Sequence, residues 1–276
     1  MQKPEPIIVA GRFPALLDAL LNLLRGLSED EWLLPTAVPG WSVKDVVQHL
    51  LGVELQILSG RRDRFSETYA QIEDWDSLVV FINQRNAAWV DATRRLSPRV
   101  LCDLMRYSGD QVNSYFQTLD VTQIGGAVSW AGPDPAPVWL DVAREFTERW
   151  HHQQHIRDAV GIPGSTQPDF LAPVLAAFVY ALPQTYRDVD APEGTSIMLT
   201  IVGPSCGAWT VVRETGGWQL YSGRPERPDA EIQLHEDAAW RLFTKGISAD
   251  QARASARLSG NISLAERALK TISIIA

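Results

Sequence analysis

The amino-acid sequence predicts an α+β fold, in which a bundle of helices precedes a smaller region of mixed helices and strands. Apolar residues recur at spacings of three and four over roughly the first 160 residues, as in amphipathic helices. Beyond segment 161–167, which is rich in Gly and Pro, the sequence has β-branched segments and the turn signal Thr215-Gly216-Gly217. We therefore expect two domains, at 1–163 and 164–276.

The N-terminal region is expected to form an antiparallel four-helix bundle. Ser28 with Glu31, and Ser42 with Asp45, have the spacing of capping boxes that open helical segments. A Pro-rich loop over 130–137 precedes the last helix of the bundle. The expected long helices are 7–27, 42–57, 75–96 and 138–160, with a helical or loop segment at 101–119. Long helices with short connections are typical of such a bundle.

The C-terminal region is expected to be a small α+β domain. Thr215, Gly216 and Gly217 separate two short apolar segments and predict a β-hairpin turn. The expected strands are 196–202, 209–213, 218–221 and 230–234. The expected helices are 170–186, 236–245, 248–256 and 264–274.

Composition excludes several classes of protein. The net charge is −8 and no basic run is longer than 61–64, which argues against a nucleic-acid partner. Cys102 and Cys206 match no zinc or disulfide pattern, so we expect two reduced, buried thiols. The N-terminus lacks a signal-peptide core, and the longest apolar stretch, 170–182, is too short for a membrane span. We expect a soluble, cytoplasmic protein without a membrane partner.

The histidines are the best sequence evidence for a functional site. His49 lies alone on an apolar helix face, whereas His151, His152 and His155 follow Glu148 on another helix. Residues four apart share a helix face, and His155 lies about 60° from His152, so Glu148, His152 and His155 can face the interior together. One imidazole from the first helix, with a carboxylate and an imidazole from the second, would hold a divalent metal with one position open. Zinc suits these ligands, and nickel, iron or manganese are alternatives.

The spacing leaves alternatives open. His49 alone could be a hydrogen-bonded core residue, and Glu148 with His152 could be a surface pair. His151 and His155 are also four residues apart, so His49, His151 and His155 form a rival triad. The two triads differ by about one helical turn.

Two segments resemble a known family. Residues 32–52 contain Pro39-Gly40-Trp41-Ser42-Val43, then an acidic residue, and then His49 before Leu-Leu-Gly. This pattern resembles the N-terminal domain of mycothiol-dependent maleylpyruvate isomerases, within the wider DinB-like group of thiol S-transferases. Residues 148–161 resemble the metal-binding helix of the same family, in which a Glu is followed four residues later by a His. The C-terminal half resembles the small sterol-carrier-like domain of these isomerases.

The resemblance implies a ligand set. Counting back from Gly161 aligns Glu148 and His152 with the family's ligands, and His49 supplies the third. His155 falls where the family commonly has an acidic residue. The resemblance therefore leaves it either behind the ligands, where it orients one of them or relays a proton, or as an alternative ligand. The family also uses an Arg of its C-terminal domain in catalysis. No motif identifies it here, and Arg253 and Arg257 are weak candidates only.

The resemblance also implies a function. We expect a thiol transferase or isomerase that depends on a divalent metal, zinc first and nickel second. Its partners would be mycothiol or another low-molecular-weight thiol and a small electrophile. One rival is a non-catalytic protein that binds an apolar ligand against Trp209, Trp218 and Trp240, unless these pack in the core. Another rival is a metal-dependent hydrolase that uses the same open site.

Overall fold

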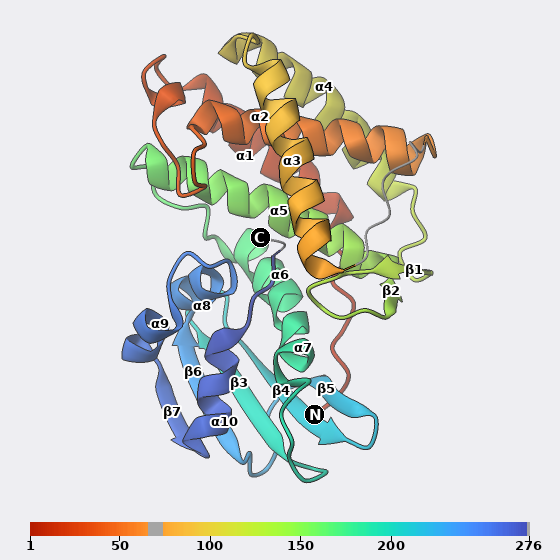
Figure 1. Cartoon of the computed structure of the whole chain (residues 1–276), viewed down its shortest axis with the longest axis vertical. Helices are drawn as coiled ribbons and strands as arrows, with labels where there is room; N and C mark the ends of the chain where they lie inside the picture. The colour runs from red at the N-terminus through yellow and green to blue at the C-terminus, as the bar shows by residue number, and fades with distance from the viewer. Residues whose placement is uncertain (66–73, 275–276) are drawn as a thin grey trace. The chain divides into compact units, whose positions relative to one another are not determined.

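The computed structural model describes residues 1–65 and 74–274, and the chain divides into two compact units (Figure 1). The helical unit comprises residues 9–120 and 148–165. The sheet unit comprises Met1–Ile8, Val121–Thr147 and Thr166–Ile275. The predicted α+β fold class is confirmed. The division into domains 1–163 and 164–276 stays a prediction. In the structure, residues 121–147 group with the sheet unit.

The described residues of the helical unit contain five long helices, because the segment left open as helix or loop is also helical. They are α1 (Phe13–Arg25), α2 (Val43–Gln56), α3 (Trp75–Thr93), α4 (Pro98–Gln117) and α5 (Val138–Ala159), of which residues 148–159 belong to this unit. Short helical turns lie at Ala10–Arg12 and Glu31–Leu33, and a π-helical turn, Ile57–Arg62, extends α2. Both predicted capping boxes are present: Ser42 and Asp45 exchange both hydrogen bonds, as do Ser28 and Glu31.

The additional helix is α4, in the segment where the sequence left helix or loop open. Polar and small residues interrupt its apolar period, and these residues have a packing role. Gly109 faces α1, where a Cβ would lie 2.6 Å from Leu17 Cδ2, so a larger residue would displace the Leu17 side chain. Ser108 and Asn113 are buried although they are polar.

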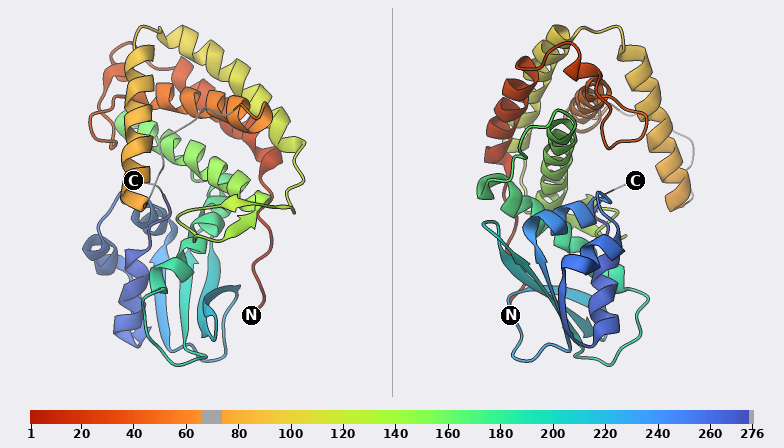
Figure 2. Two further views of the ribbon diagram at one scale, coloured as in Figure 1. Left: turned by 45° about the vertical axis from the view of Figure 1, so that its right-hand side comes forward. Right: turned by 90° about the vertical axis from the view of Figure 1, so that its left-hand side faces the viewer.

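Helices α1, α2 and α4 share an apolar core with the end of α5. It includes Leu17, Leu21, Leu24, Val43, Val47, Leu50, Leu51, Leu101, Met105 and Ile156. Helix α3 lies on the outside of this group (Figure 2). It is attached through Trp89, whose Nε1 donates to the Gln48 carbonyl oxygen at 2.7 Å. The indole lies against Gly52, where a Cβ would be 2.7 Å from the ring.

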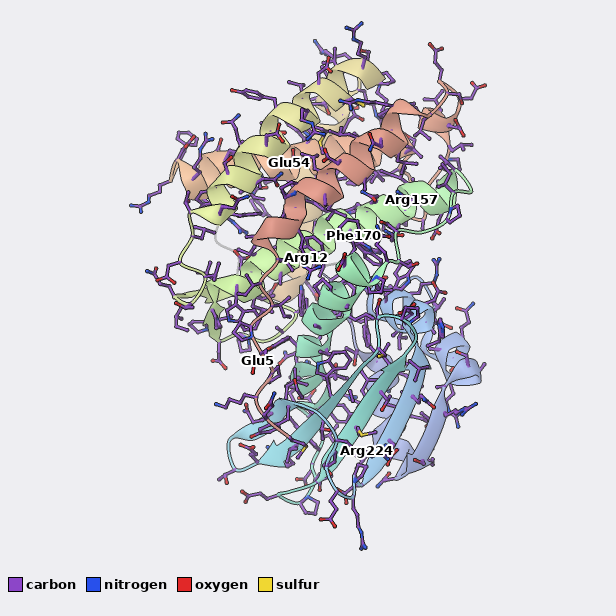
Figure 3. The ribbon with its side chains drawn as sticks, turned by 180° about the vertical axis from the view of Figure 1, so that it is seen from behind. Glu5, Arg12, Glu54, Arg157, Phe170 and Arg224 are labelled. Carbon is purple, nitrogen blue, oxygen red and sulfur yellow. The ribbon has the colours of Figure 1, made fainter. Side chains whose placement is uncertain are left out.

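A buried charged pair joins α2 to α5. Glu54 (labelled in Figure 3) accepts a hydrogen bond from Ser108 Oγ at 2.5 Å, and its Oε1 lies 3.8 Å from Arg149 Nε. The Arg149 guanidinium stacks on the rings of Phe13 and Phe116. Burial raises the pKa of Glu54 to about 7, because the loss of water outweighs the opposing effects of Arg149 and Ser108.

The sheet unit is built around five strands in the order β5-β4-β3-β6-β7. They are β3 (Ser196–Val202), β4 (Gly207–Glu214), β5 (Gly217–Ser222), β6 (Ala230–His235) and β7 (Arg257–Gly260). Only β3 and β6 are parallel. The predicted hairpin is confirmed, because Glu214 pairs with Gly217 across a two-residue turn. The helices are α6 (Pro168–Phe178), α7 (Leu182–Tyr186), α8 (Glu236–Phe243), α9 (Ala249–Ser255) and α10 (Ile262–Arg267).

The two faces of this sheet differ in polarity. Ile197, Leu199 and Ile201 pair with Ala230, Ile232 and Leu234, and all six are buried. These residues point to the face that carries the helices, whereas the alternate residues Thr200, Glu231 and Gln233 point to the opposite face. That open face carries no helix (Figure 3). An antiparallel or mixed sheet of this kind buries one face and leaves the other to water.

Some predicted elements differ from the structure. The expected helix 170–186 is divided by a 3-10 turn, Val179–Ala181, because Pro183 at the start of α7 cannot donate a helical hydrogen bond. The expected helix 264–274 ends in the turn Ala268–Lys270. Strand β7 and a small hairpin of β1 (Ile124–Ala127) and β2 (Pro135–Pro137) were not predicted, because their Gly and Pro content indicates loop.

No helix in the described residues is long and apolar enough to cross a membrane.

The buried Glu54 predicts a pH-dependent stability. The folded pKa, about 7, is raised above the ordinary 4.5, so the folded chain binds a proton more tightly than the unfolded chain between these values. The free energy of unfolding should therefore fall as pH rises from 4.5 to 7, by up to about 3 kcal/mol from this group. Glu54→Gln should reduce this fall in urea unfolding at several pH values. Glu29→Gln, at an exposed position, should behave like the wild type. Equal pH profiles for Glu54→Gln and the wild type would contradict the assignment.

Candidate metal centre

Two helices of the helical unit bring three potential metal ligands together. His49 lies in α2, seven residues after its Ser42 cap, and Glu148 and His152 lie one helical turn apart in α5. One ligand atom from each of these residues lies within 4.8 Å of the others. The described residues, 1–65 and 74–274, contain one group of His, Cys, Asp and Glu side chains with the geometry of a metal site, and these three residues form it.

The imidazoles converge on a single oxygen. His49 Nε2 lies 3.1 Å from Glu148 Oε1, and His152 Nε2 lies 3.0 Å from the same atom. The two rings are 4.8 Å apart in an edge-to-face arrangement. Two nitrogen donors and one carboxylate oxygen directed at a common point are a ligand set that zinc binds, with a fourth position for water or substrate.

The electrostatics of the site favour a cation. Burial by itself raises the pKa of Glu148, but His152 and then His49 oppose this effect and hold the pKa well below its usual range. The two imidazoles therefore stabilise the carboxylate without a metal. A bound divalent cation would supply that positive charge and leave the imidazoles neutral, as metal ligands must be.

The site is open on one side. The His49 side chain is 7% exposed, whereas those of His152 and Glu148 are 12% and 28% exposed. Trp41, from the loop before α2, packs against His49 with ring centroids 5.2 Å apart. In the sequence, Trp41 belongs to the Pro-Gly-Trp motif, and its position eight residues before His49 is the signal for this contact.

His155 lies behind His152. The Nδ1 atoms of the two rings are 3.3 Å apart. A metal at Nε2 of His152 requires the proton of that ring on Nδ1, from which it can donate to His155 Nδ1. His151 is buried, and its ring contacts that of His155 at 4.1 Å. In the structure, His49 therefore lies beside Glu148 and His152. His151 and His155, the other two members of the rival triad, contact each other instead.

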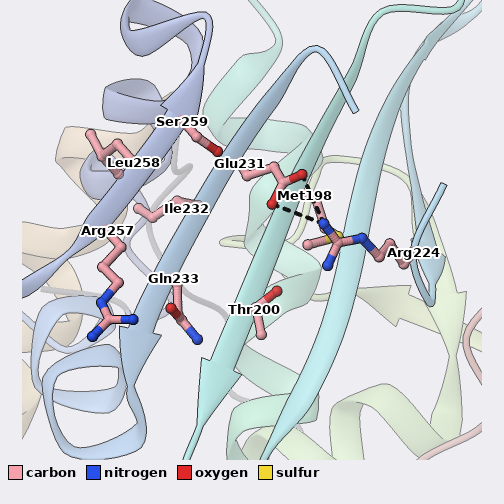
Figure 4. Close-up of a pocket in the computed structure, with 9 residues that line it drawn as sticks. All are labelled: Met198, Thr200, Arg224, Glu231, Ile232, Gln233, Arg257, Leu258 and Ser259. Carbon is pink, nitrogen blue, oxygen red and sulfur yellow. Dashed lines mark hydrogen bonds and ion pairs between the residues drawn. The ribbon is translucent and has the colours of Figure 1, made fainter. Parts of the chain in front are cut away.

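The C-terminal arginine candidates lie in the sheet unit. Arg253 pairs with Glu266 at 3.0 Å on an exposed surface. Arg257 lines a groove on the open face of the sheet, beside Gln233 (Figure 4). In the same groove Arg224 donates to both oxygens of Glu231, at 3.0 and 3.2 Å.

Three tryptophans and a histidine of the sheet unit have structural roles. Trp209, Trp218 and Trp240 are buried, and the Trp218 and Trp240 indoles donate to the Val189 carbonyl and to Asp237. These tryptophans therefore form part of the core. His235 caps α8 by accepting from the Asp237 amide at 3.3 Å.

The expectation for the cysteines is correct for one residue only. Cys102 and Cys206 are both free. Cys102 is buried, as expected, and burial raises the pKa of its thiol. Cys206 is exposed, because it lies in the turn between β3 and β4 and not in a strand.

Known proteins resemble this chain. The family model of the mycothiol maleylpyruvate isomerase N-terminal domain matches residues 13–157. A crystal structure of the mycothiol-dependent maleylpyruvate isomerase is 13% identical, with a TM-score of 0.50, and the match covers 84% of this chain and 86% of that chain. A point mutant of the isomerase is 12% identical, with a TM-score of 0.48 over the same shares. No curated protein matches the chain. At these identities the likeness to solved structures shows the fold alone.

The arrangement of the three side chains predicts which substitutions abolish metal binding. His49→Ala and His152→Ala should each lower zinc affinity by more than about 100-fold, because a ligand is lost, and His155→Ala by about tenfold, because an orienting partner is lost. Competition titration with a chromophoric chelator measures these affinities. His235→Ala, which removes an exposed histidine of the sheet unit, is the matched control and should bind zinc normally. A larger loss in His151→Ala than in His152→Ala would favour the rival triad.

Proposed function

Since the chain belongs to the family of the mycothiol maleylpyruvate isomerase N-terminal domain, we propose that it is a metal-dependent thiol transferase or isomerase. In this proposal a low-molecular-weight thiol, with mycothiol first, adds to a small electrophile. Family membership confirms the resemblance that the two sequence motifs indicated. The observation that supports the proposal most directly is the convergence of His49, Glu148 and His152 on a common point.

The proposed roles of the residues follow from their geometry. His49 and His152 present Nε2 atoms, and Glu148 presents Oε1, as the three ligands of a divalent ion, with zinc the first choice and nickel the second. When bound, the ion would lower the pKa of a coordinated thiol, so that a thiolate exists near neutral pH. His155 holds the Nδ1 proton of His152 and so keeps Nε2 available.

The exposure of the ligands supports access for small molecules. Glu148 and His152 are partly exposed, whereas His49 is buried, so a thiol would approach from the α5 side. In an isomerase the thiol sulfur adds to one carbon of a conjugated double bond, the resulting single bond rotates, and the thiol leaves. In a transferase the carbon–sulfur bond remains, and the adjacent carbon takes up a proton.

The proposal predicts turnover that depends on a thiol. Zinc-loaded protein should isomerise maleylpyruvate, or conjugate another electrophile, with mycothiol but not without a thiol. Glu148→Gln should lower kcat/KM at least about 100-fold, because the neutral amide neither balances the metal charge nor holds the histidines. His235→Ala should retain full activity, since it lies in the sheet unit. The assay follows loss of the substrate's ultraviolet absorbance.

Two results would contradict this function. Equal turnover with and without thiol would favour the hydrolase, in which water is the nucleophile. Zinc-loaded protein that converts none of a panel of thiols and conjugated electrophiles would favour the non-catalytic protein.

A further inference from the structure

A second cavity, of about 240 Å³, lies entirely within the sheet unit. Its lining comes from segments far apart in sequence: the β1–β2 connection, α7 and the end of α10. Its functional side chains are Trp130, Gln184, Arg187, Arg267, Lys270 and Ile272. None of the residues that line it belongs to the helical unit, which contains His49, Glu148 and His152.

The charge of this cavity is opposite to that of the chain. The chain has a net charge of −8, yet among the described residues three cations and no carboxylate line the cavity. Asp188 lies 3.5 Å from Arg187 and offsets one of these cations. The positive charge therefore rests mainly on Arg267 and Lys270. By contrast, the groove on the open face of the sheet has Glu231 paired with Arg224.

Arg267 is positioned to receive an anion. Its Nε donates to the Thr185 carbonyl oxygen at 2.7 Å, which holds the side chain in place. Within the described residues its two terminal nitrogens make no hydrogen bond, and Lys270 Nζ has no partner either. A guanidinium held through Nε presents a planar pair of donors that matches a carboxylate or a phosphate. Lys270 is exposed and supplies a second, mobile positive charge.

The remaining wall is apolar. Trp130 is 5% exposed, and Ala181 and Ile272 line the cavity beside it. An indole and two aliphatic side chains favour a flat apolar group. The cavity is smaller than the ~300–1,000 Å³ of drug-sized pockets, so a ligand that fits is a small molecule.

We propose that this cavity binds a small organic dianion with a flat aromatic body. Anionic oxygens of the ligand would bind the terminal nitrogens of Arg267 and lie near Lys270, either from two carboxylates or from one phosphate, and the ring would pack against Trp130. The dianion is either an aromatic dicarboxylate or an aromatic phosphate monoester, since both present the same charge on the same body. The site is independent of the metal centre and extends the proposed function.

The probes are phthalate and phenyl phosphate, with benzamide as the neutral control. Isothermal titration uses the full chain carrying His49→Ala and His152→Ala, so that no carboxylate can bind a metal at the other site. We expect saturable 1:1 binding of at least one dianion, weakened by added salt, and none of benzamide. The stronger of the two dianions identifies the natural class.

The decisive variant is Lys270→Met, because Lys270 is exposed and without a partner in the described residues, so the fold does not depend on it. It should weaken binding of the dianion about tenfold, as expected for the loss of a charged partner. Lys3→Met makes the same substitution at an exposed position of the same unit outside the cavity, and should leave binding unchanged. Arg267→Lys keeps the charge but removes the planar donors, and should weaken binding several-fold.

Three results would overturn the proposal. The first is equal affinity of Lys270→Met and its parent for both dianions. The second is equal weakening by Lys3→Met, which would mean that only net charge matters. The third is no binding of either dianion at millimolar concentration by protein that keeps its circular dichroism spectrum. Failure of thiol-dependent turnover would leave all of these outcomes unaffected, because the titration is made without metal.

Discussion

The alignment of α2 with α5 is the constraint on which the helical unit depends. Neighbouring residues of a helix point about 100° apart, so Glu148 and Arg149 reach different parts of α2. Glu148 meets His49 at 3.1 Å, and Arg149 lies 3.8 Å from Glu54. A shift of α5 by one residue would separate both pairs and leave charges buried without partners. The two contacts therefore fix both the rotation and the position of α5 against α2.

These contacts provide specificity more than stability. Taking a carboxylate and a guanidinium out of water costs several kcal/mol per ion, and their attraction only partly offsets this cost. The raised pKa of Glu54 has the same physical cause, because burial outweighs the attraction of Arg149. The arrangement persists because the apolar core of Leu, Val and Ile residues supplies the favourable free energy. The result is one defined helix alignment, which a site of three convergent ligands requires.

In the sheet unit, the two faces of the sheet differ in polarity. Its covered face is apolar along β3 and β6, and its open face carries polar side chains, among which Arg224 pairs with Glu231. In the cavity beside α7, Arg267 and Lys270 have no acidic partner among the residues that the structure describes. Two neighbouring cations without an opposing charge attract an anion, and this attraction is the physical basis for the proposed binding role.

The sequence by itself determined the features that depend on local spacing. The capping box of Ser42 and Asp45, the turn at 215–216 and the strand at 196–202 each involve residues a few positions apart, and all are present in the structure. The tertiary structure decided the features that join distant segments. His49 and Glu148 are 99 residues apart in the sequence. Helical periodicity could not select Glu148 and His152 over His151 and His155, because both pairs are four residues apart and only the packing of α2 against α5 shows which pair faces His49. For the same reason β7, the buried pair of Glu54 with Arg149 and the cavity at Trp130 escaped prediction: each exists only where segments distant in sequence pack together.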